Sequence, residues 1–230
     1  LNESFTKVLS DKGIAADLHE HFSFYVDGYK FMPKYKHGMW DGKINLFNLQ
    51  SRKLPLGLTK DLIDWADNEE YYVDVDPEIE AIFENPDYDE TEVDEFIDSI
   101  DVHLKDKKTG EVKQIFPQDH QIKSIHAIIK MQKCLLLSPT SSGKSLIIYY
   151  VMRWHLANRS TDSDKFLIVV PTIQLVNQMY SDFDEYATLD DWSSTDHCHK
   201  ITAGKDKQTD LAVVISTWQS IYKMSPDYFS

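Results

Sequence analysis

The sequence predicts an α/β protein in which a doubly wound parallel sheet follows a smaller α/β unit. Three observations predict it. The segment 134–153, CLLLSPTSSGKSLIIYYVMR, has the pattern of a strand, a tight polar loop and a helix. Two later apolar runs, FLIVV at 166–170 and LAVVI at 211–215, follow at distances that suit parallel crossovers. Their continuous β-branched character predicts strands buried on both faces.

Composition and charge limit the classes of protein to which this chain can belong. The chain has 230 residues, of which 42% are apolar, and this content suits two globular domains. We place them at 1–104 and 116–230, with a linker at 105–115. Cys134 and Cys198 are far apart in sequence, which disfavours a disulfide framework or a zinc cluster and fits a reducing cytoplasm. The apolar run 146–152 is too short to span a bilayer, and the N-terminus has no signal-peptide pattern, so no membrane is implied.

The net charge of -14 is concentrated in one interval. No Lys or Arg occurs between Lys60 and Lys105, and the acids of this interval include a tract from Glu78 to Asp101. The second half of the tract predicts an amphipathic helix with its apolar residues at helical spacing, namely Val93, Phe96, Ile97 and Ile100. We interpret its charge as a solvated face. The alternative is an acidic screen that mimics nucleic acid or limits non-specific binding.

The first unit begins with a predicted short helix around Phe5 and Leu9 that ends near Gly13. A hairpin is expected around Asp27-Gly28, followed by a strand within 42–49. A helix over 59–68, capped by Thr59, then precedes a strand YYVDV at 71–75, which Pro77 ends.

A cluster of basic and aromatic residues lies in this unit. Lysines neutralise phosphates and exposed rings stack on bases, so the cluster predicts a nucleic-acid contact, with Lys34, Lys36 and Trp40 as the candidates. The alternative is that the rings form the core of a small sheet and the lysines its solvated face. The cluster comprises Tyr29, Lys30, Phe31, Lys34, Tyr35, Lys36, His37, Trp40, Lys43, Arg52 and Lys53.

The second unit follows the polar segment LKDKKTGEVK. Asp119 is the expected N-cap of a helix whose apolar stripe is Ile122, Ile125, Ile128 and Ile129. The helix after the polar loop should reach about Asn158. A further helix should start at Thr172, with Leu175, Met179 and Phe183 on one side.

The polar loop before that long helix predicts a phosphate site. Backbone N–H groups of such a loop and the positive end of the following helix hold a triphosphate. Gly143 allows close approach, Lys144 would reach the β- and γ-phosphates as the catalytic cation, and the Ser145 hydroxyl would be a ligand of the Mg²⁺ that accompanies ATP. The alternative is a helix that merely follows a polar turn. The candidate ATP-binding residues are Pro139, Thr140, Ser141, Ser142, Gly143, Lys144 and Ser145.

Several short segments of the second unit together resemble the first RecA-like lobe of superfamily 2 helicases, over residues 116–230. They are FPQDHQ at 116–121, SPTSSGKS at 138–145, VVPTIQLVNQ at 169–178, ITAGK at 201–205 and VVISTWQS at 213–220. The resemblance implies that Gln121 reads adenine. It also implies DNA contacts from loops at the strand ends, and the candidates are Pro171, Thr172, Gln178, Thr202, Gly204, Thr217 and Trp218.

The segments DGYKFMPKYKHGMWDGKINLF and LPLGL extend the resemblance to UvsW-type superfamily 2 DNA helicases of tailed phages. This resemblance implies ATP- and Mg²⁺-dependent unwinding or branch migration of branched DNA in recombination and repair. We expect a monomer that binds duplex or branched DNA, in the host cytoplasm if a phage encodes it.

The sequence stops before any Asp-Glu-x-His motif, second lobe or arginine finger of that family. We therefore expect these 230 residues to bind ATP without hydrolysing it appreciably. Three alternatives stay open: a non-catalytic DNA-binding or regulatory module, the motor of a restriction-type translocase, and a P-loop kinase. The kinase lacks support because no arginine-rich lid follows the second strand.

Overall fold

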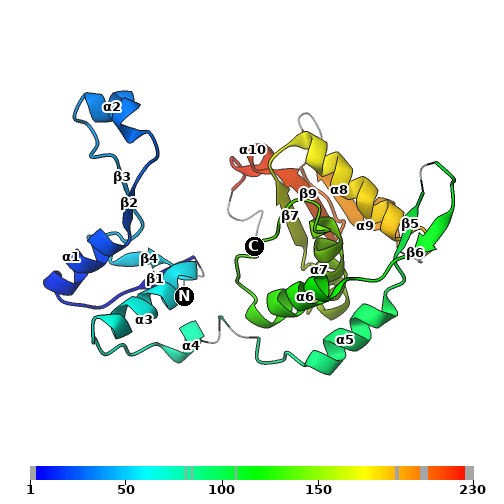
Figure 1. Ribbon diagram of the computed structural model, residues 1–230, viewed down its shortest axis with the longest axis horizontal. Helices are drawn as coiled ribbons and strands as arrows, with labels where there is room; N and C mark the ends of the chain where they lie inside the picture. Colours follow the sequence, from blue (N-terminus) through cyan, green and yellow to red (C-terminus); the bar gives the residue numbers. More distant parts are fainter. Residues whose placement is uncertain are drawn as a thin grey trace. The chain divides into compact units, whose positions relative to one another are not determined.

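The computed structural model describes residues 4–80, 82–83, 85–106, 108–189, 192–202 and 207–225. It divides the chain into two compact units, Leu1–Glu84 and Asn85–Ser230 (Figure 1). The α/β prediction is confirmed, with a parallel three-stranded sheet in the second unit.

The first unit packs two helices on a short antiparallel pair. Strand β1 (Phe5–Lys7) pairs with β4 (Lys53–Pro55), and α1 (Lys12–His21) and α3 (Thr59–Asn68) lie beside them (Figure 1). A 3₁₀ turn, η2 (Leu56–Leu58), joins β4 to α3. The buried core of this unit consists of Ala15, Leu18, Phe22, Phe47, Leu54 and Leu62.

An arm extends from this base. Strands β2 (Ser23–Tyr25) and β3 (Lys43–Asn45) pair antiparallel, and the residues between them form η1 (Tyr29–Phe31) and α2 (Pro33–Lys36) at the far end (Figure 1). The predicted hairpin around Asp27-Gly28 is therefore wrong. Gly28 instead takes a left-handed conformation, φ +70°, and starts η1, so β2 pairs with a strand that returns only after the helical tip.

Other predictions for this unit are also corrected. The segment around Phe5 is β1 and not a helix, and Gly13 lies in the first turn of α1, whose N-cap is Asp11. The helix over 59–68 is confirmed, but Thr59 is inside it and Leu58 is the N-cap. Thr59 is buried instead and its hydroxyl hydrogen-bonds that of Thr6, 2.6 Å away. Residues 71–75 form no strand, and Pro77 begins α4 (Pro77–Glu80).

The second unit contains the parallel sheet. Its strand order is β7-β9-β8, with β7 at Phe166–Val170, β9 at Val213–Thr217 and β8 at Cys198–Ile201. Register pairs Val170 with Thr217 and Ile201 with Ser216, so the three strands end at one edge. The helices of this unit are α5 (Glu90–Ser99), α6 (Asp119–Met131), α7 (Lys144–Asn158), α8 (Ile173–Tyr186), α9 (Ser194–His197) and α10 (Trp218–Ile221).

Burial differs from strand to strand. All five residues of β9 are buried, because β9 lies between two neighbours. The strand begins at Val213, two residues later than the predicted run at 211–215, and Leu211 and Ala212 are only partly buried. Leu167 and Val169 of β7 are 39% and 48% exposed, so the prediction of burial on both faces is wrong for this strand. Strand β7 is an edge of the described sheet, so these two side chains have a neighbouring strand on one side only. On the same face, Val214 of the central strand β9 is buried against Ile221 of α10.

The strand predicted at 134–137 is also not formed among the described residues. Cys134 is exposed, and Leu135 and Leu137 are 85% and 86% exposed. No described strand pairs with this segment, so its apolar side chains remain in solvent. The segment still leads directly into the polar loop and α7, which begins at Lys144 as predicted.

The boundary between units lies earlier than the sequence suggested. Helix α5 and the hairpin β5 (His103–Lys105) and β6 (Val112–Gln114) belong to the second unit, and Val93, Ile97 and Val102 are buried in its core. Residues 105–115 are thus largely a hairpin and not a free linker. His126 of α6 bridges Tyr88 and Asp94, at 2.9 Å from each, and this fastens α5 to α6. No helix in the described ranges is long and apolar enough to cross a membrane.

Candidate functional site

The polar loop closes around the ammonium group of Lys144. Its Nζ donates to the carbonyl oxygens of Ser138 and Pro139, at 3.3 and 2.5 Å. The Ser142 hydroxyl donates to the Pro139 carbonyl at 2.9 Å and lies 2.5 Å from the Ser138 hydroxyl. Thr140 and Ser141 are exposed at the loop tip, where Ser141 has φ +64°. The loop therefore holds a cation over its own carbonyl groups.

Gly143 joins this loop to α7 in a conformation that suits glycine. Its φ is +76°, and a Cβ there would lie 2.2 Å from Nε2 of Gln121. It is the N-cap of a 15-residue helix, and no side chain caps its first turn. The Leu146 N–H donates to the Gly143 carbonyl at 3.0 Å. The two N–H groups before it, those of Lys144 and Ser145, have no acceptor within the helix, and the helix dipole favours an anion there. These features fit a phosphate group.

Gln121 lies beneath the loop and connects it to α6. The side chain is 6% exposed; its Oε1 accepts from the Gln118 N–H at 2.8 Å, and its Nε2 donates to the Ser142 carbonyl at 3.0 Å. Gln118 and Gln121 form a capping box, so the prediction that Asp119 is the N-cap is wrong. His120, which the sequence pattern did not single out, also reaches the Ser142 carbonyl, with Nε2 at 3.1 Å.

Ser145 has a partner that the sequence did not reveal. Its hydroxyl lies 2.9 Å from that of Tyr186, which is at the end of α8 and 8% exposed. Burial raises the pKa of Tyr186, and the hydrogen bond to Ser145 opposes that shift. Nothing in the local pattern around Tyr186 points to this contact, because the two residues are 41 positions apart.

A magnesium ion at Ser145 would depend on the nucleotide. Hard cations take oxygen ligands, and a serine hydroxyl is one. Within the described ranges, however, no group of three or more His, Cys, Asp or Glu side chains could hold a metal ion. An ion beside the Ser145 hydroxyl would therefore need further oxygen ligands from the nucleotide.

The candidate DNA-binding residues of the second unit lie mostly at one edge of the sheet; Gln178 is in the second turn of α8. Pro171 and Thr172 follow β7, Thr202 follows β8, and Thr217 ends β9. Register brings these strand ends side by side. Gly204 lies outside the described residues.

These candidate residues differ in how exposed their side chains are and in whether their hydroxyl groups already have hydrogen-bond partners. Trp218 is 55% exposed and Gln178 is exposed, whereas Thr217 is buried and lies 2.9 Å from the Ser220 hydroxyl. Thr172 is exposed, but its hydroxyl caps α8 by accepting from the Leu175 N–H at 3.3 Å. The edge therefore offers an exposed ring and exposed polar groups, and Thr217 serves mainly to hold the turn.

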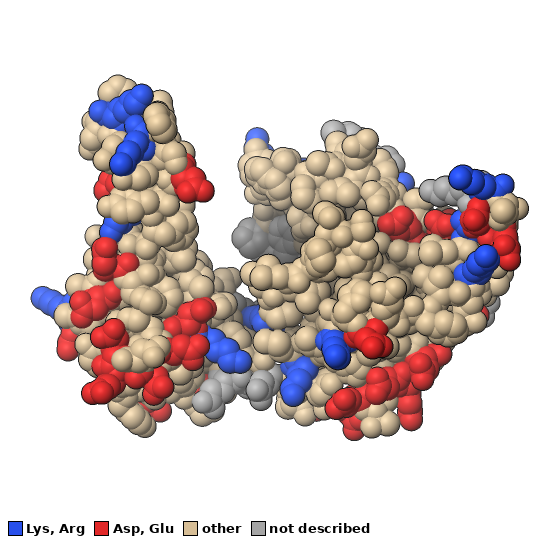
Figure 2. Space-filling model, in the orientation of Figure 1, with Lys and Arg blue, Asp and Glu red and all other residues tan. Residues whose placement is uncertain are grey.

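The arm of the first unit carries the remaining candidates. Lys34 and Lys36 are exposed on α2, and Lys and Arg side chains gather at this tip in Figure 2. Lys43 lies lower on the arm and is engaged with Glu20 at 2.5 Å, a hydrogen bond that raises the pKa of the lysine. Acidic side chains gather instead over α5 of the second unit (Figure 2).

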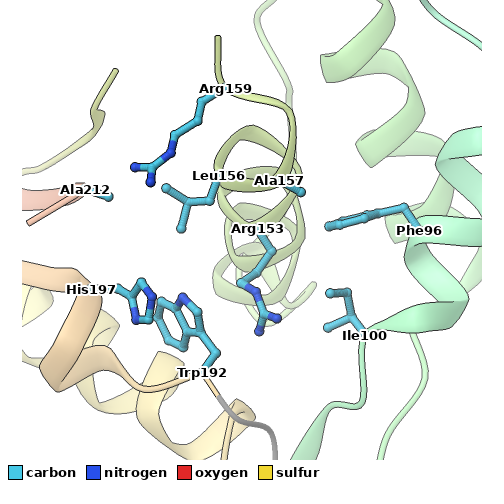
Figure 3. Close-up of a pocket in the computed structure, with 9 residues that line it drawn as sticks. All are labelled: Phe96, Ile100, Arg153, Leu156, Ala157, Arg159, Trp192, His197 and Ala212. Atoms are coloured by element: carbon cyan, nitrogen blue, oxygen red, sulfur yellow. The ribbon is translucent and has the colours of Figure 1, made fainter. Parts of the chain in front are cut away.

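A cavity of about 260 Å³ in the second unit is separate from the phosphate loop. The Trp192 and His197 rings stack in it at 5.1 Å, with the Arg153 guanidinium 5.3 Å from the Trp192 ring (Figure 3). Arg153 is nine residues along α7 from Lys144, which is about 14 Å of helix. The cavity contains none of the predicted site residues; its lining is Phe96, Ile100, Arg153, Leu156, Ala157, Arg159, Trp192, His197 and Ala212.

Two protein families match this chain. Residues 2–76 match the family described as DNA helicase UvsW, N-terminal, and residues 118–229 match the DEAD/DEAH box helicase family. The ATP-dependent DNA helicase uvsW of Enterobacteria phage T4 is 31% identical over 231 residues, which cover 99% of this chain and 43% of the relative. An uncharacterized helicase of Caenorhabditis elegans, C28H8.3, is 32% identical over 80 residues, or 35% of this chain.

Two crystal structures of T4 UvsW have the same fold across the chain. Both are 30% identical to it and cover all of it, with TM-scores of 0.83 and 0.82. This chain covers 44% of the first solved chain and 77% of the second. It therefore spans less than half of the length of the phage T4 protein that it matches.

Proposed function

Because the chain belongs to the UvsW-like helicases, with a UvsW N-terminal domain followed by part of a DEAD/DEAH box helicase domain, we propose that it binds ATP and DNA as part of an ATP-dependent DNA helicase. The observation that carries the proposal is the junction of the polar loop with α7. There an uncapped helix N-terminus, Gly143 with φ +76° and the Lys144 ammonium group converge.

In this proposal the residues of the loop have distinct tasks. Lys144 leaves the Ser138 and Pro139 carbonyls and pairs with the β- and γ-phosphates, which are stronger acceptors. The open N–H groups at the start of α7 bind the same phosphates. Ser145 is a ligand of the accompanying Mg²⁺, which offsets phosphate charge when bound. Gln121 positions the loop from below and turns its amide to the adenine edge when ATP enters.

Nucleotide titration tests this site. Binding of a fluorescent ATP analogue with Mg²⁺ should weaken at least tenfold in Lys144→Ala, because one full charge on the phosphates is removed. Lys123→Ala is the matched control, since Lys123 is an exposed lysine of neighbouring α6. Equal affinity of Lys144→Ala and the unaltered chain would overturn the proposal.

DNA would lie along the strand-end edge of the second unit and on the arm of the first. At this edge, contacts to the backbone or bases would come from Trp218, Pro171, Thr172 and Thr202, with Gln178 adding one from α8. Thr217 would hold the turn that presents Trp218. Lys34 and Lys36 would contact phosphates from α2. Trp40 is a weaker candidate than the sequence suggested, because its indole N–H is engaged with the Lys43 carbonyl at 2.7 Å.

Salt-dependent binding tests the arm. A Lys34→Glu/Lys36→Glu chain should bind DNA more weakly than the unaltered chain. The slope of log affinity against log salt should fall by roughly one for each lysine–phosphate ion pair that the substitutions remove. Lys60→Glu/Lys123→Glu changes the net charge equally at exposed lysines outside the arm. Identical weakening by both pairs of substitutions would contradict a specific role of the arm.

The substrate and the catalytic capacity are part of the same proposal. We assign branched DNA, such as fork and recombination intermediates in repair, as the substrate of the intact phage-type enzyme. These 230 residues contain no Asp-Glu-x-His motif, and we expect them to turn over ATP negligibly with or without DNA. Robust DNA-stimulated hydrolysis by this chain would contradict that expectation.

A further inference from the structure

The arm of the first unit is held by its own aromatic residues. The Tyr25 and Tyr29 rings stack at 4.7 Å, and the Tyr35 ring meets Tyr29 edge-on at 4.8 Å. A Cβ on Gly42 would lie 2.2 Å from the Tyr29 ring, so this ring packs directly on the returning strand. The Val26 N–H also donates to the Gly42 carbonyl at 2.9 Å. These interactions hold the arm together along its length, from strand pair to tip.

Two large apolar residues at the tip are not part of this packing. Phe31 is 80% exposed at the end of η1, and Met39 is 72% exposed just beyond α2. Isolated exposed apolar residues are ordinary on protein surfaces. Here two of them lie within nine residues of each other at the end of a projecting arm, where neither contributes to a core. Such an exposed pair suits contact with another molecule.

The charge around these residues indicates what that molecule is. Lys30, Lys34 and Lys36 are exposed in the same short segment, and no acid occurs between Asp27 and Asp41. Exposed basic side chains therefore share this short segment with an exposed ring, on a protein whose net charge is -14. Lys and Arg side chains gather at the tip of the arm in Figure 2. A polyanion that also presents flat apolar faces satisfies both features, and nucleic acid is such a ligand.

We propose that the tip of the arm binds the exposed base face at a junction of single- and double-stranded DNA. The Phe31 ring stacks on the unpaired or terminal base, Met39 covers its edge, and Lys30, Lys34 and Lys36 hold the adjacent phosphates. Bases inside a continuous duplex already stack on both sides, so only an end or a junction offers a free face. The proposal rests on DNA binding by the arm and specifies which DNA structure the arm selects.

Binding of this 230-residue chain to two DNAs tests the inference. One is a fork with 2-aminopurine at the junction, and the other is a relaxed, covalently closed duplex circle, which has no end, no loop and no unpaired base. Phe31→Ala should weaken fork binding about tenfold, leave binding to the closed duplex within about twofold, and remove the fluorescence change of 2-aminopurine. Phe31→Trp should bind the fork and the closed duplex like the unaltered chain and should keep the 2-aminopurine fluorescence change, because it restores a stacking ring.

Tyr72→Ala is the matched control, since Tyr72 is 93% exposed in the same unit but lies outside the arm. It should behave like the unaltered chain. Fork binding by Phe31→Ala equal to that of the unaltered chain overturns the stacking site. In that case, weaker binding of Lys34→Glu/Lys36→Glu to both DNAs would still support DNA binding by the arm, without the stacking site at Phe31. If Lys34→Glu/Lys36→Glu also has no effect, both the stacking site and DNA binding by the arm are overturned. The proposal that Lys144 binds ATP does not depend on this result.

Discussion

The side chain of Gln121 fills the space that Gly143 leaves empty. A Cβ on Gly143 would lie 2.2 Å from Gln121 Nε2, and the same Nε2 donates to the neighbouring Ser142 carbonyl at 3.0 Å. The conformation of the loop thus depends on the absence of one side chain and on the presence of another from α6. Both residues lie where the helix N-terminus is open to phosphate.

Gly143→Ala should lower the free energy of unfolding by about 2 kcal/mol. A left-handed conformation costs an L-residue about 1–2 kcal/mol, and the added methyl group would also displace Gln121. Urea unfolding followed by circular dichroism measures the change. Gly57→Ala is the control, because nothing lies within 4 Å of a Cβ at Gly57 and its φ is not positive.

A double-mutant cycle separates the two causes. Gln121→Ala removes the obstructing amide, so Gly143→Ala should cost less in that background, with a coupling of about 1 kcal/mol. Additive effects would show that the amide yields freely and that backbone conformation alone makes Gly143 necessary.

Tyr186→Phe should lower the free energy of unfolding by about 1 kcal/mol. The change removes the hydrogen bond to Ser145 and leaves a partly buried hydroxyl without that partner. Ser145→Ala should cost a similar amount, and the double variant should cost less than the sum. Thermal unfolding is the measurement, and Tyr222→Phe, at a 61% exposed tyrosine, is the control. Strict additivity would mean that the two hydroxyls do not stabilise each other.

Tyr150→Phe should flatten the loss of stability at alkaline pH. Burial, assisted by Tyr149 and Asp98, raises the pKa of Tyr150 to about 12, from an ordinary value near 10. A raised pKa means that the folded state holds its proton more tightly. The stability from this group is therefore complete below about pH 10 and is lost as the pH rises toward 12.

The unaltered chain should lose about 1 kcal/mol more than Tyr150→Phe between pH 9 and pH 11. Urea unfolding at both pH values provides the comparison. Tyr72→Phe, which changes a tyrosine that is 93% exposed, should leave the difference as it is in the unaltered chain. Parallel losses of stability in the unaltered chain and in Tyr150→Phe would contradict the assignment.

A protein comprising residues 85–230 should be more stable than one comprising 105–230. The shorter protein lacks Val93, Ile97 and Val102, which are buried in the core of the second unit, and each contributes about 1.5–3 kcal/mol on burial. We expect 105–230 to show no cooperative thermal transition. His126→Ala in 85–230 should cost about 1 kcal/mol through its bonds to Tyr88 and Asp94. Equal stability of the two proteins would favour the boundary at 104.

Local sequence patterns predicted some of the regular elements of the second unit well, although the strand expected at 134–137 is not formed in the part of the chain that the structure describes. The helix that begins at Lys144 and the strand Phe166–Val170 are strongly apolar, the helix that begins near Thr172 is amphipathic, and all three lie where they were expected. The short elements of the first unit were predicted less well. Strands of three residues carry too little periodicity, and β2 reaches its partner β3 only across 17 intervening residues.

The sequence by itself determined the chemistry of the phosphate loop, since a glycine, a lysine and a serine at the start of an apolar helix are recognisable from the residues alone. Tertiary structure alone decided what surrounds them. Tyr186 approaches Ser145, Gln121 packs under Gly143, and Phe31 is left free while Tyr29, Tyr35 and Trp40 hold the arm. Spacing along the chain encodes which face a residue occupies, whereas contacts between distant residues depend on how whole elements pack.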